Sequence, residues 1–488
     1  MKKTTLSELK KRNGKLLSPW VDQLGDVLSL TSWSIDRLPE YIWMALILED
    51  LGRVNGISCC IRIFNKMRLW NPEYDTAKMS IFLAINEAEQ DALYDIIKSE
   101  ANPEILAPLT AVIGFDYSPS FYRHFYMPNY DYERRIEKLA VVSKVYYRPD
   151  SNEGTDLRFL SLIPQVLSGS LSHPPNTPLS EALYNYGNLE HSEPIMGLYR
   201  TSIRATEGAI ALSDGSTSAW INHFWDITSK ATDCGLHYIV FGKEDSEMDY
   251  LEFIENTKEA LNYLNIQHKQ DTVTDEAYIV LSGSLVFAFK TFAEVIHHDL
   301  SNTIIGRQSV RIIIETYIMM KYLVSQEGSK PNIWSEYQAY GIGKYKLILM
   351  KLREDKDDGV HHVDERILDL LVNEPQLEEF TDIDLKYFDS AKIREKAFGV
   401  GEKALYDVAY DYDSSYAHGL WGAVRESSML ACDNIFHHFR PVTDALLKQK
   451  LPDITWDCYN YLRKLILLVN DRYPFPEWYI NYIGVANE

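Results

Sequence analysis

The sequence predicts an all-α protein, with a multi-helix N-terminal region over residues 1–270 and an antiparallel helical bundle over residues 271–488. Three observations support this fold class. Apolar residues recur every three or four positions through most of the chain, which is typical of helices that bury one face. Residues 237–241 (HYIVF) are the one short run that looks like a β-strand. The 488 residues, 46% of them hydrophobic, are enough for roughly two to four domains with buried cores.

The N-terminal helices follow from this spacing. In residues 38–51, Pro39 stands where a first-turn proline is tolerated, Ile42, Leu46 and Glu49 follow at helical intervals, and Gly52 ends the run. The same pattern predicts helices over residues 57–70, 77–99, 132–145, 219–232 and 250–264.

Polar stretches divide the chain. Residues 148–156 are expected to form a loop, and residues 168–194, with several prolines, to be irregular surface chain. The polar run 268–275 precedes the strongly helical C-terminal part, so we place the main division near residue 270.

Longer helices follow this division. They are expected over residues 275–302, 306–325 and 333–353, over 392–405 or beyond, over a separate segment from 418 to 437, and over 456–470. Each would bury one stripe against its neighbours, as in an antiparallel bundle. Residues 357–371 and the acidic run after them are interpreted as a surface excursion.

The charge balance argues against duplex DNA as a partner. The chain has 49 Lys and Arg against 70 Asp and Glu, a formal net charge of −21, whereas proteins that wrap a duplex usually carry a basic surplus. The basic residues 1–15 are interpreted as a solvated terminus, and no apolar signal segment follows them. We therefore expect a cytoplasmic protein.

Neither a disulfide framework nor a metal cluster is predicted. The five cysteines are odd in number and include no Cys-x-x-Cys pair, so we expect reduced thiols, no metal and no cofactor. The apolar run 278–289 has about twelve residues, short of the roughly 20 that cross a bilayer. It is interpreted as a buried helix, and no membrane partner is expected.

One group of polar residues is a candidate site. Arg311 and Glu315 are four apart and so share a helix face. Further along, Tyr410, Ser414 and His418 also recur every fourth residue. Arg425 lies seven beyond His418, so these two side chains would point nearly the same way on a continuous helix.

These residues resemble the motifs of an uncharacterised bacterial family, the domain of unknown function DUF5677. Its members have an Arg-x-x-x-Glu helix, here Arg311 and Glu315, and later a Tyr-rich helix that ends in Ser-x-x-x-His-Gly, here Ser414, His418 and Gly419. The resemblance covers roughly residues 275–439 and implies a helical bundle. We expect an interaction or regulatory module, in a bacterial stress or anti-phage defence setting, with a protein partner or a second copy of the chain.

A more distant likeness supplies the alternative hypothesis. Helical ribonucleases of the HEPN type hold an Arg and a His four to six residues apart, because RNA cleavage needs a proton acceptor and a cation beside the phosphate. Here the order is His418 and then Arg425. In this metal-independent enzyme, His418 would be the general base or acid, Arg425 and Arg311 would stabilise phosphate charge, and Glu315 would orient an Arg. Otherwise Arg311, Glu315, Ser414, His418 and Arg425 form a buried network that fixes helix register.

Other motifs favour structural roles. The three His-His pairs diverge on a helix and rarely supply two ligands to one metal. Glu294-x-x-His297 is half of a di-iron motif and occurs once. The glycines at 341, 343, 399 and 401 are expected to mark the ends of helices. Residues 122–135 mix aromatic and basic side chains. They are interpreted as a capping loop or a protein interface rather than a surface on which nucleic-acid bases stack.

Overall fold

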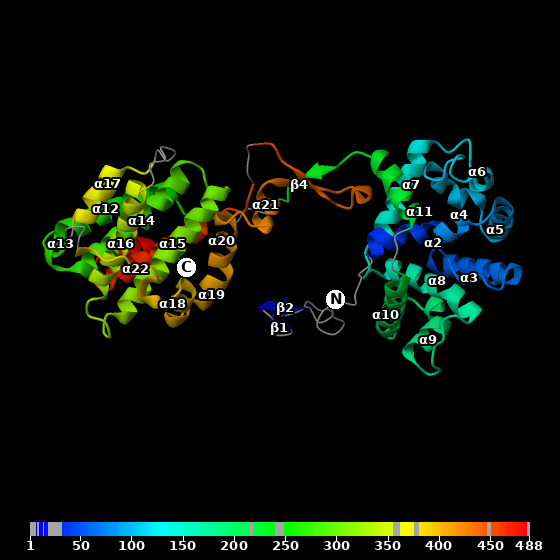
Figure 1. Ribbon diagram of the computed structural model, residues 1–488, viewed down its shortest axis with the longest axis horizontal. Helices are drawn as coiled ribbons and strands as arrows, with labels where there is room; N and C mark the ends of the chain where they lie inside the picture. Colours follow the sequence, from blue (N-terminus) through cyan, green and yellow to red (C-terminus); the bar gives the residue numbers. More distant parts are fainter. Residues whose placement is uncertain are drawn as a thin grey trace. The chain divides into compact units, whose positions relative to one another are not determined.

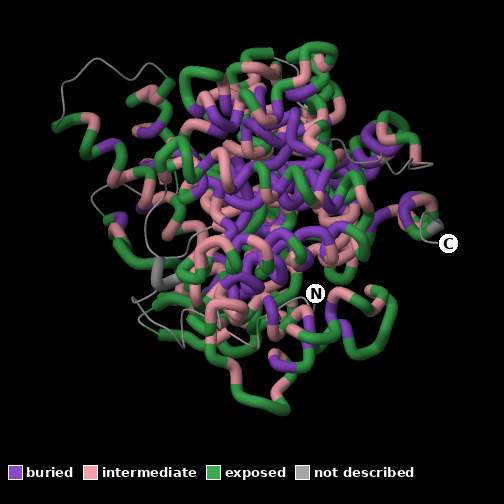
Figure 2. Tube along the Cα trace, turned by 90° about the vertical axis from the view of Figure 1, so that its right-hand side faces the viewer, coloured by how far each residue is buried: buried purple, intermediate pink, exposed green. Residues whose placement is uncertain are grey.

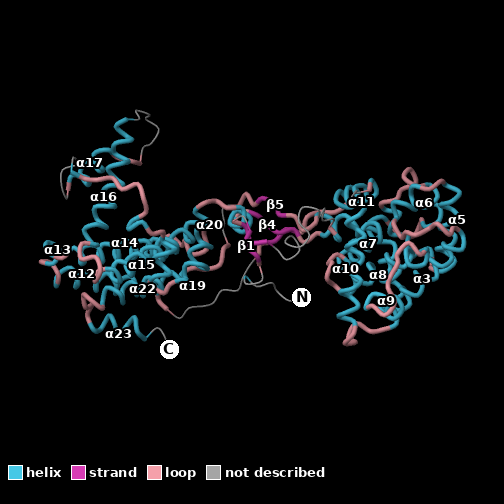
Figure 3. The backbone as a smooth tube through the Cα atoms, turned by 60° about the horizontal axis from the view of Figure 1, so that its bottom comes forward, coloured by secondary structure: helices cyan, strands magenta, loops and turns pink. Residues whose placement is uncertain are grey.

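The computed structural model describes residues 6, 9–12, 14–17, 32–214, 218–239, 248–354, 362–374, 380–446 and 450–485. Helices dominate the described chain and the strands are short (Figure 3), which confirms the all-α prediction. The chain forms two compact units. Unit 1 comprises Met1–Leu236 and Cys432–Arg440, and unit 2 comprises His237–Ala431 and Pro441–Glu488.

Unit 1 is built around a helix that is buried on all sides. This helix, α2 (Leu38–Leu51), has the predicted bounds, with Pro39 in its first turn and Gly52 at its end. Its sequence is apolar around the whole circumference, and such helices lie inside a core. The buried carboxylate of Glu40 is satisfied, because it accepts from the Ser80 amide at 2.8 Å and the Ser218 hydroxyl at 2.7 Å.

The other helices of unit 1 pack against α2 or against one another (Figure 1). They are η3 (Trp33–Arg37), α3 (Arg53–Trp70), α4 (Met79–Ala84), α5 (Glu87–Glu100), η4 (Pro103–Ala111), α6 (Pro119–Phe125), α7 (Tyr132–Tyr146), α8 (Asn152–Ser168), α9 (Pro178–Asn185), η5 (Tyr186–Asn188), α10 (Met196–Asp214), α11 (Ala219–Lys230) and, from the returning segment, η9 (Ile435–His437). Two short strands, β1 (Lys10–Arg12) and β2 (Lys15–Leu17), pair antiparallel.

Several N-terminal predictions need correction. The predicted helix 77–99 is two helices, because Asn86 adopts an extended conformation and its side chain accepts from the Glu89 amide to begin α5. The stretch 168–194, expected to be irregular, contains α9, which Thr177 caps. The predicted strand 237–241 is reduced to β3 (Leu236–His237), and residues 240 and 241 lie outside the described part.

Unit 2 has a second core, formed by long helices. Its central helices are α14 (Glu276–His297), α15 (Ile304–Gln326) and α22 (Thr455–Asn470), which pack against one another. Residues from all three helices are buried in this core, and Figure 2 colours the buried residues of the described chain purple. Among the described residues, α14 is one helix that is long and apolar enough to cross a membrane by length and composition alone, and 39% of its most apolar window is buried inside this core.

The remaining elements of unit 2 complete the bundle. They are α12 (Tyr250–Gln267), α13 (Asp271–Thr274), α16 (Ile333–Glu354), α17 (Glu365–Asn373), η7 (Phe388–Ser390), α18 (Ile393–Gly399), α19 (Lys403–Leu405), η8 (Tyr406–Tyr410), α20 (Asp411–Ala417), α21 (Trp421–Ser427), β4 (Met429–Cys432), β5 (Pro441–Thr443) and α23 (Glu477–Val485). Strands β4 and β5 pair antiparallel, with Leu430 opposite Val442. Helices α16 and α17 lie side by side (Figure 3) and share a small apolar cluster.

The division between the units differs from the predicted one near residue 270. Helix α12 contributes Phe253 and Leu264 to the core of unit 2, so the chain leaves unit 1 before this helix, after Leu236. A short segment, Cys432–Arg440, returns to unit 1 and adds Ile435 and Phe436 to its core.

Candidate functional site in the C-terminal unit

The polar residues of α15 lie on the face that packs against α20. Arg307, Arg311 and Glu315 are four residues apart, and each step of four turns a helix by little more than one full rotation. Tyr410 and Ser414 have the same spacing on the facing segment. Because α15 contacts both η8 and α20, the two rows meet.

The two rows are joined by a chain of hydrogen bonds. Arg311 donates from Nε to the Ser414 hydroxyl at 3.0 Å and from Nη2 to the Tyr410 hydroxyl at 2.8 Å. The Tyr410 hydroxyl in turn donates to Oε2 of Glu315 at 2.9 Å. Oε2 of Glu315 also lies 3.3 Å from Nη2 of Arg311. We call these four residues the Arg311 cluster.

The cluster is half-buried and its tyrosine is neutral at ordinary pH. The side chain of Arg311 is 25% exposed and that of Glu315 is 41% exposed. Burial, reinforced by the negative charge of Glu315, raises the pKa of Tyr410 to about 12. Tyr410 therefore remains a hydrogen-bond donor to Glu315, and its ring lies 5.0 Å below the Arg311 guanidinium.

This geometry limits what Ser414 can do. A serine nucleophile must give its proton to a base, but among the described residues the Ser414 hydroxyl has no hydrogen bond to a base and its oxygen accepts from Arg311. Glu315, the carboxylate of the cluster, is engaged by Tyr410 and Arg311. The arrangement is suited to holding α15 and α20 in register.

His418 and Arg425 lie apart from this hydrogen-bond network. His418 is exposed and directly follows α20, and the next residue, Gly419, has a φ of +57°. Arg425 is half-buried on α21, where its Nη1 donates to the Met429 carbonyl at 3.4 Å. Among the described residues, no hydrogen bond or ion pair links either side chain to the Arg311 cluster.

The predicted helix over residues 418–437 is therefore wrong. The chain turns at Gly419, forms the short helix α21, and continues as β4 and η9. Because the helix is not continuous, the seven-residue spacing of His418 and Arg425 does not set the relative direction of their side chains.

A second polar group beside the cluster was missed by sequence reasoning. Arg307 donates from Nη2 to the Pro452 carbonyl at 2.8 Å and lies over the ring of Tyr412. Burial, reinforced by Asp457 and opposed by Arg307, raises the pKa of Asp413 to about 7. The signal was present in the spacing, since Arg307 precedes Arg311 by four and Asp413 precedes Ser414 directly.

The same helix also contacts the chain after α18. The Tyr317 hydroxyl and Nζ of Lys321 donate to Oε1 of Glu402 at 2.8 and 2.5 Å. Burial acts against ionisation of Glu402, but these donors lower its pKa. Polar contacts thus hold α15 against neighbouring segments at several positions along its length.

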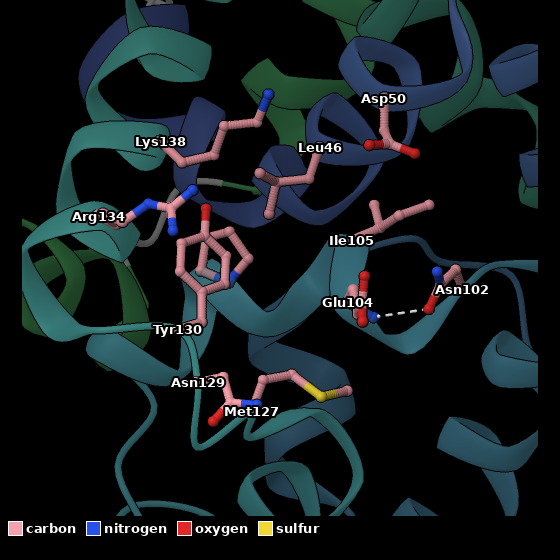
Figure 4. Close-up of a pocket in the computed structure, with 11 residues that line it drawn as sticks. Leu46, Asp50, Asn102, Glu104, Ile105, Met127, Asn129, Tyr130, Arg134 and Lys138 are labelled. Atoms are coloured by element: carbon pink, nitrogen blue, oxygen red, sulfur yellow. Dashed lines mark hydrogen bonds between the residues drawn. The ribbon is translucent and has the colours of Figure 1, made fainter.

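Unit 1 contains a pocket of mixed charge, with a volume of about 390 Å³. In Figure 4, Arg134 and Lys138 of α7 lie on one side of it, and Asp50 of α2 and Glu104 of η4 lie on the other. Residues 122–135, which supply Tyr130 to this pocket, run from the end of α6 through a loop into α7, where the Asp131 side chain accepts from the Arg134 amide at 2.8 Å.

Fold and site together define an all-helical protein whose C-terminal unit carries an interhelical polar cluster. Residues 278–437 match the model of the Family of unknown function (DUF5677), which confirms the resemblance seen in the Arg311, Glu315 and Ser414 motifs. No curated protein matches the chain, and no solved structure matches it. The family has no assigned activity, so the likeness to HEPN ribonucleases and the stress or defence setting stay predictions.

Proposed function

We propose that the protein is a helical interaction protein that associates with a second copy of itself through the start of α21. The observation that carries this proposal is an exposed apolar pair. Leu420 and Trp421 are adjacent in the chain and are 55% and 65% exposed. Tryptophan is the residue most enriched among those that dominate binding energy at protein interfaces, and large exposed apolar side chains mark such surfaces.

The segment that carries Leu420 and Trp421 is held in place by packing and hydrogen bonds. Behind it, Ala423 of α21 is buried with Tyr416 and Leu451, and Ile304 packs against them. The Arg311 cluster holds α20 against α15 just before the turn at Gly419. A rigid anchor loses little conformational entropy on binding, which favours association.

A second copy of the chain is the partner that this surface fits. In a two-fold symmetric contact the same patch is used twice, so a small patch contributes double its area. One turn along α21, Arg425 and Glu426 carry opposite charges. Each can then face its opposite in the other copy, whereas the net charge of −21 would otherwise oppose self-association. We further propose a reducing, cytoplasmic setting, in keeping with five free cysteine thiols.

The test is the molar mass of the full chain in solution, measured by light scattering and sedimentation over a range of concentrations. We expect the wild type to be a dimer. We expect Trp421→Ser to be a monomer, or to dimerise with at least tenfold weaker affinity. The matched control is Trp478→Ser, since Trp478 is 43% exposed on α23. A wild type that is monomeric throughout, or a Trp421→Ser variant that dimerises normally, would overturn the proposal.

The ribonuclease hypothesis makes a different prediction and is tested in parallel. Purified wild type, His418→Ala and Arg311→Ala are incubated with mixed RNA in the presence of a metal chelator. An enzyme that uses these residues would cleave RNA only as the wild type. Among the described residues, no hydrogen bond or ion pair joins His418 to Arg311 or Arg425, and this favours intact RNA in all three samples.

A further inference from the structure

Three potential metal ligands meet in unit 1, although they are far apart in sequence. Cys234 follows α11, Cys432 ends β4, and His437 ends η9. Their ligand atoms all lie within 4.8 Å of one another. Nδ1 of His437 is 3.0 Å from Sγ of Cys234 and 3.6 Å from Sγ of Cys432.

The histidine is oriented as a metal ligand would be. Its other nitrogen, Nε2, lies 3.0 Å from the Ser229 carbonyl. A carbonyl accepts only, so Nε2 carries the proton and the lone pair of Nδ1 points at the two sulfur atoms. Such a bond from the far nitrogen to a carbonyl is the usual outer-shell support of a ligating histidine.

The two segments that supply the ligands are fastened together around the site. The side-chain amide of Asn434 donates to the Thr232 hydroxyl at 2.9 Å and to the Asp233 carbonyl at 2.8 Å. The Asp433 amide donates to the Gly235 carbonyl at 3.0 Å. A Cβ at Gly235 would lie 1.9 Å from the Asp433 carboxylate, so this close approach requires glycine.

The burial of these three residues also suits a metal site. Cys432 and His437 are 2% and 7% exposed, whereas Cys234 is partly exposed. Two thiolates and one imidazole are the donor set that thiophilic, tetrahedral Zn²⁺ prefers, with sulfur at about 2.3 Å and nitrogen at about 2.0 Å. Tetrahedral angles at such distances put the ligand atoms roughly 3.5–3.8 Å apart, and the two nitrogen–sulfur distances here are 3.0 and 3.6 Å.

We propose that Cys234, Cys432 and His437 form a Zn²⁺ site that binds the returning segment Cys432–Arg440 to the rest of unit 1. The two thiols would lose their protons to solvent on binding, so that two thiolate charges balance the ion. Water or another donor would take the fourth position on the partly exposed side of Cys234. Sequence inspection missed the site because it joins cysteines that are 198 positions apart, by the difference of their numbers.

The experiment uses the full chain, purified under reducing conditions, stripped with a chelator and titrated with Zn²⁺ and with Co²⁺. We expect one equivalent of either metal per chain, and with Co²⁺ the visible bands and sulfur-to-metal charge transfer of a tetrahedral thiolate site. Zn²⁺ should also raise the melting temperature of unit 1. Cys234→Ser should bind metal at least tenfold more weakly and lose this rise, and its partial exposure favours retained folding.

Cys59→Ser is the matched control, because Cys59 lies outside the site and its sulfur contacts the Glu100 carbonyl at 3.4 Å, a bond that a serine hydroxyl can replace. This variant should bind metal as the wild type does. Binding that is equally strong in Cys234→Ser, or no binding by a folded wild type, would overturn the proposal. So would a thiol titration of denatured, untreated protein that finds three free thiols rather than five, since Cys234 and Cys432 would then form a disulfide.

Discussion

At the scale of single residues, Tyr410 is the centre of the Arg311 cluster, since its hydroxyl accepts from Arg311 and donates to Glu315. We predict that Tyr410→Phe lowers the free energy of unfolding of unit 2 by about 1–2 kcal/mol, because both bonds involve charged partners while the direct contact between Arg311 and Glu315 remains. Urea denaturation, with hydrogen exchange of α15 and α20, measures this loss. Tyr345→Phe, at a tyrosine that is 44% exposed on α16, is the control. Equal stability of both variants would contradict the role given to Tyr410.

The raised pKa of Asp413 predicts that the folding stability of unit 2 depends on pH. Its pKa is about 7 in the folded chain, against an ordinary value of 3.8. Between these values the unfolded chain releases the proton and the folded chain keeps it, so folding stability falls as pH rises from about 4 to 7. We expect the wild type to lose roughly 2–4 kcal/mol over this interval relative to Asp413→Asn.

Denaturant titrations of unit 2 at several pH values measure this difference. Asp116→Asn, at an exposed residue of unit 1, should leave the pH profile of the wild type unchanged. A profile of Asp413→Asn that parallels the wild type would show that other groups, such as Asp457, carry the dependence.

The cluster shows what residue spacing can and cannot predict. Arg311, Glu315 and Ser414 were singled out because a repeat of four places side chains on one helix face, and the structure does bring them together. His418 belongs to the same repeat but lies beyond the last turn of α20, where Gly419 changes the chain direction. Spacing identifies residues on one face, but it does not reveal where a helix ends.

At the scale of elements, the two glycines of α16 make opposite predictions. Both were expected to punctuate a helix, yet both lie inside α16. A Cβ at Gly343 would lie 2.5 Å from the Asp382 carbonyl, whereas a Cβ at Gly341 meets nothing within 4 Å. We predict that Gly343→Ala destabilises unit 2 by about 1–3 kcal/mol through overpacking, and that Gly341→Ala stabilises it by roughly 0.5–1 kcal/mol through helix propensity.

Thermal unfolding of the two variants beside the wild type provides the test, and each variant is the matched control of the other. The sign of the change should differ between positions only two residues apart. A loss of similar size at both would mean that helix flexibility, rather than the close approach at Gly343, governs α16.

Element boundaries were predictable where one local signal dominates. Helix α2 has the bounds expected from Pro39 and Gly52, and α22 begins one residue before its predicted start. The long helix expected from residue 392 is instead broken at Gly401, whose φ is +81°. Left-handed glycines and side-chain caps such as Asn86 compete with apolar periodicity, and the periodicity alone does not show which one prevails.

At the scale of the whole molecule, the composition of the two units could not be derived from the order of the sequence. A polar run near residue 270 looked like a boundary, but helix α13 occupies part of that run and belongs to unit 2. The return of Cys432–Arg440 to unit 1 depends on contacts with residues about 200 positions earlier, such as the bond from Asn434 to Thr232. Periodicity reports local structure and carries no information on such distant pairing.

The returning segment yields the last prediction. Phe436 is 1% exposed, belongs to the core of unit 1, and packs beside Phe224 and Trp225 of α11. Phe436→Ala should therefore destabilise unit 1 by about 3–5 kcal/mol through the cavity it leaves. Hydrogen exchange read by mass spectrometry should show weaker protection of α11 and unchanged protection of α15 and α22, because those two helices belong to the other core. Phe287→Ala, at a residue that is 56% exposed on α14, should change neither. Equal loss of protection in both units after Phe436→Ala would contradict the assignment of residues 432–440 to unit 1.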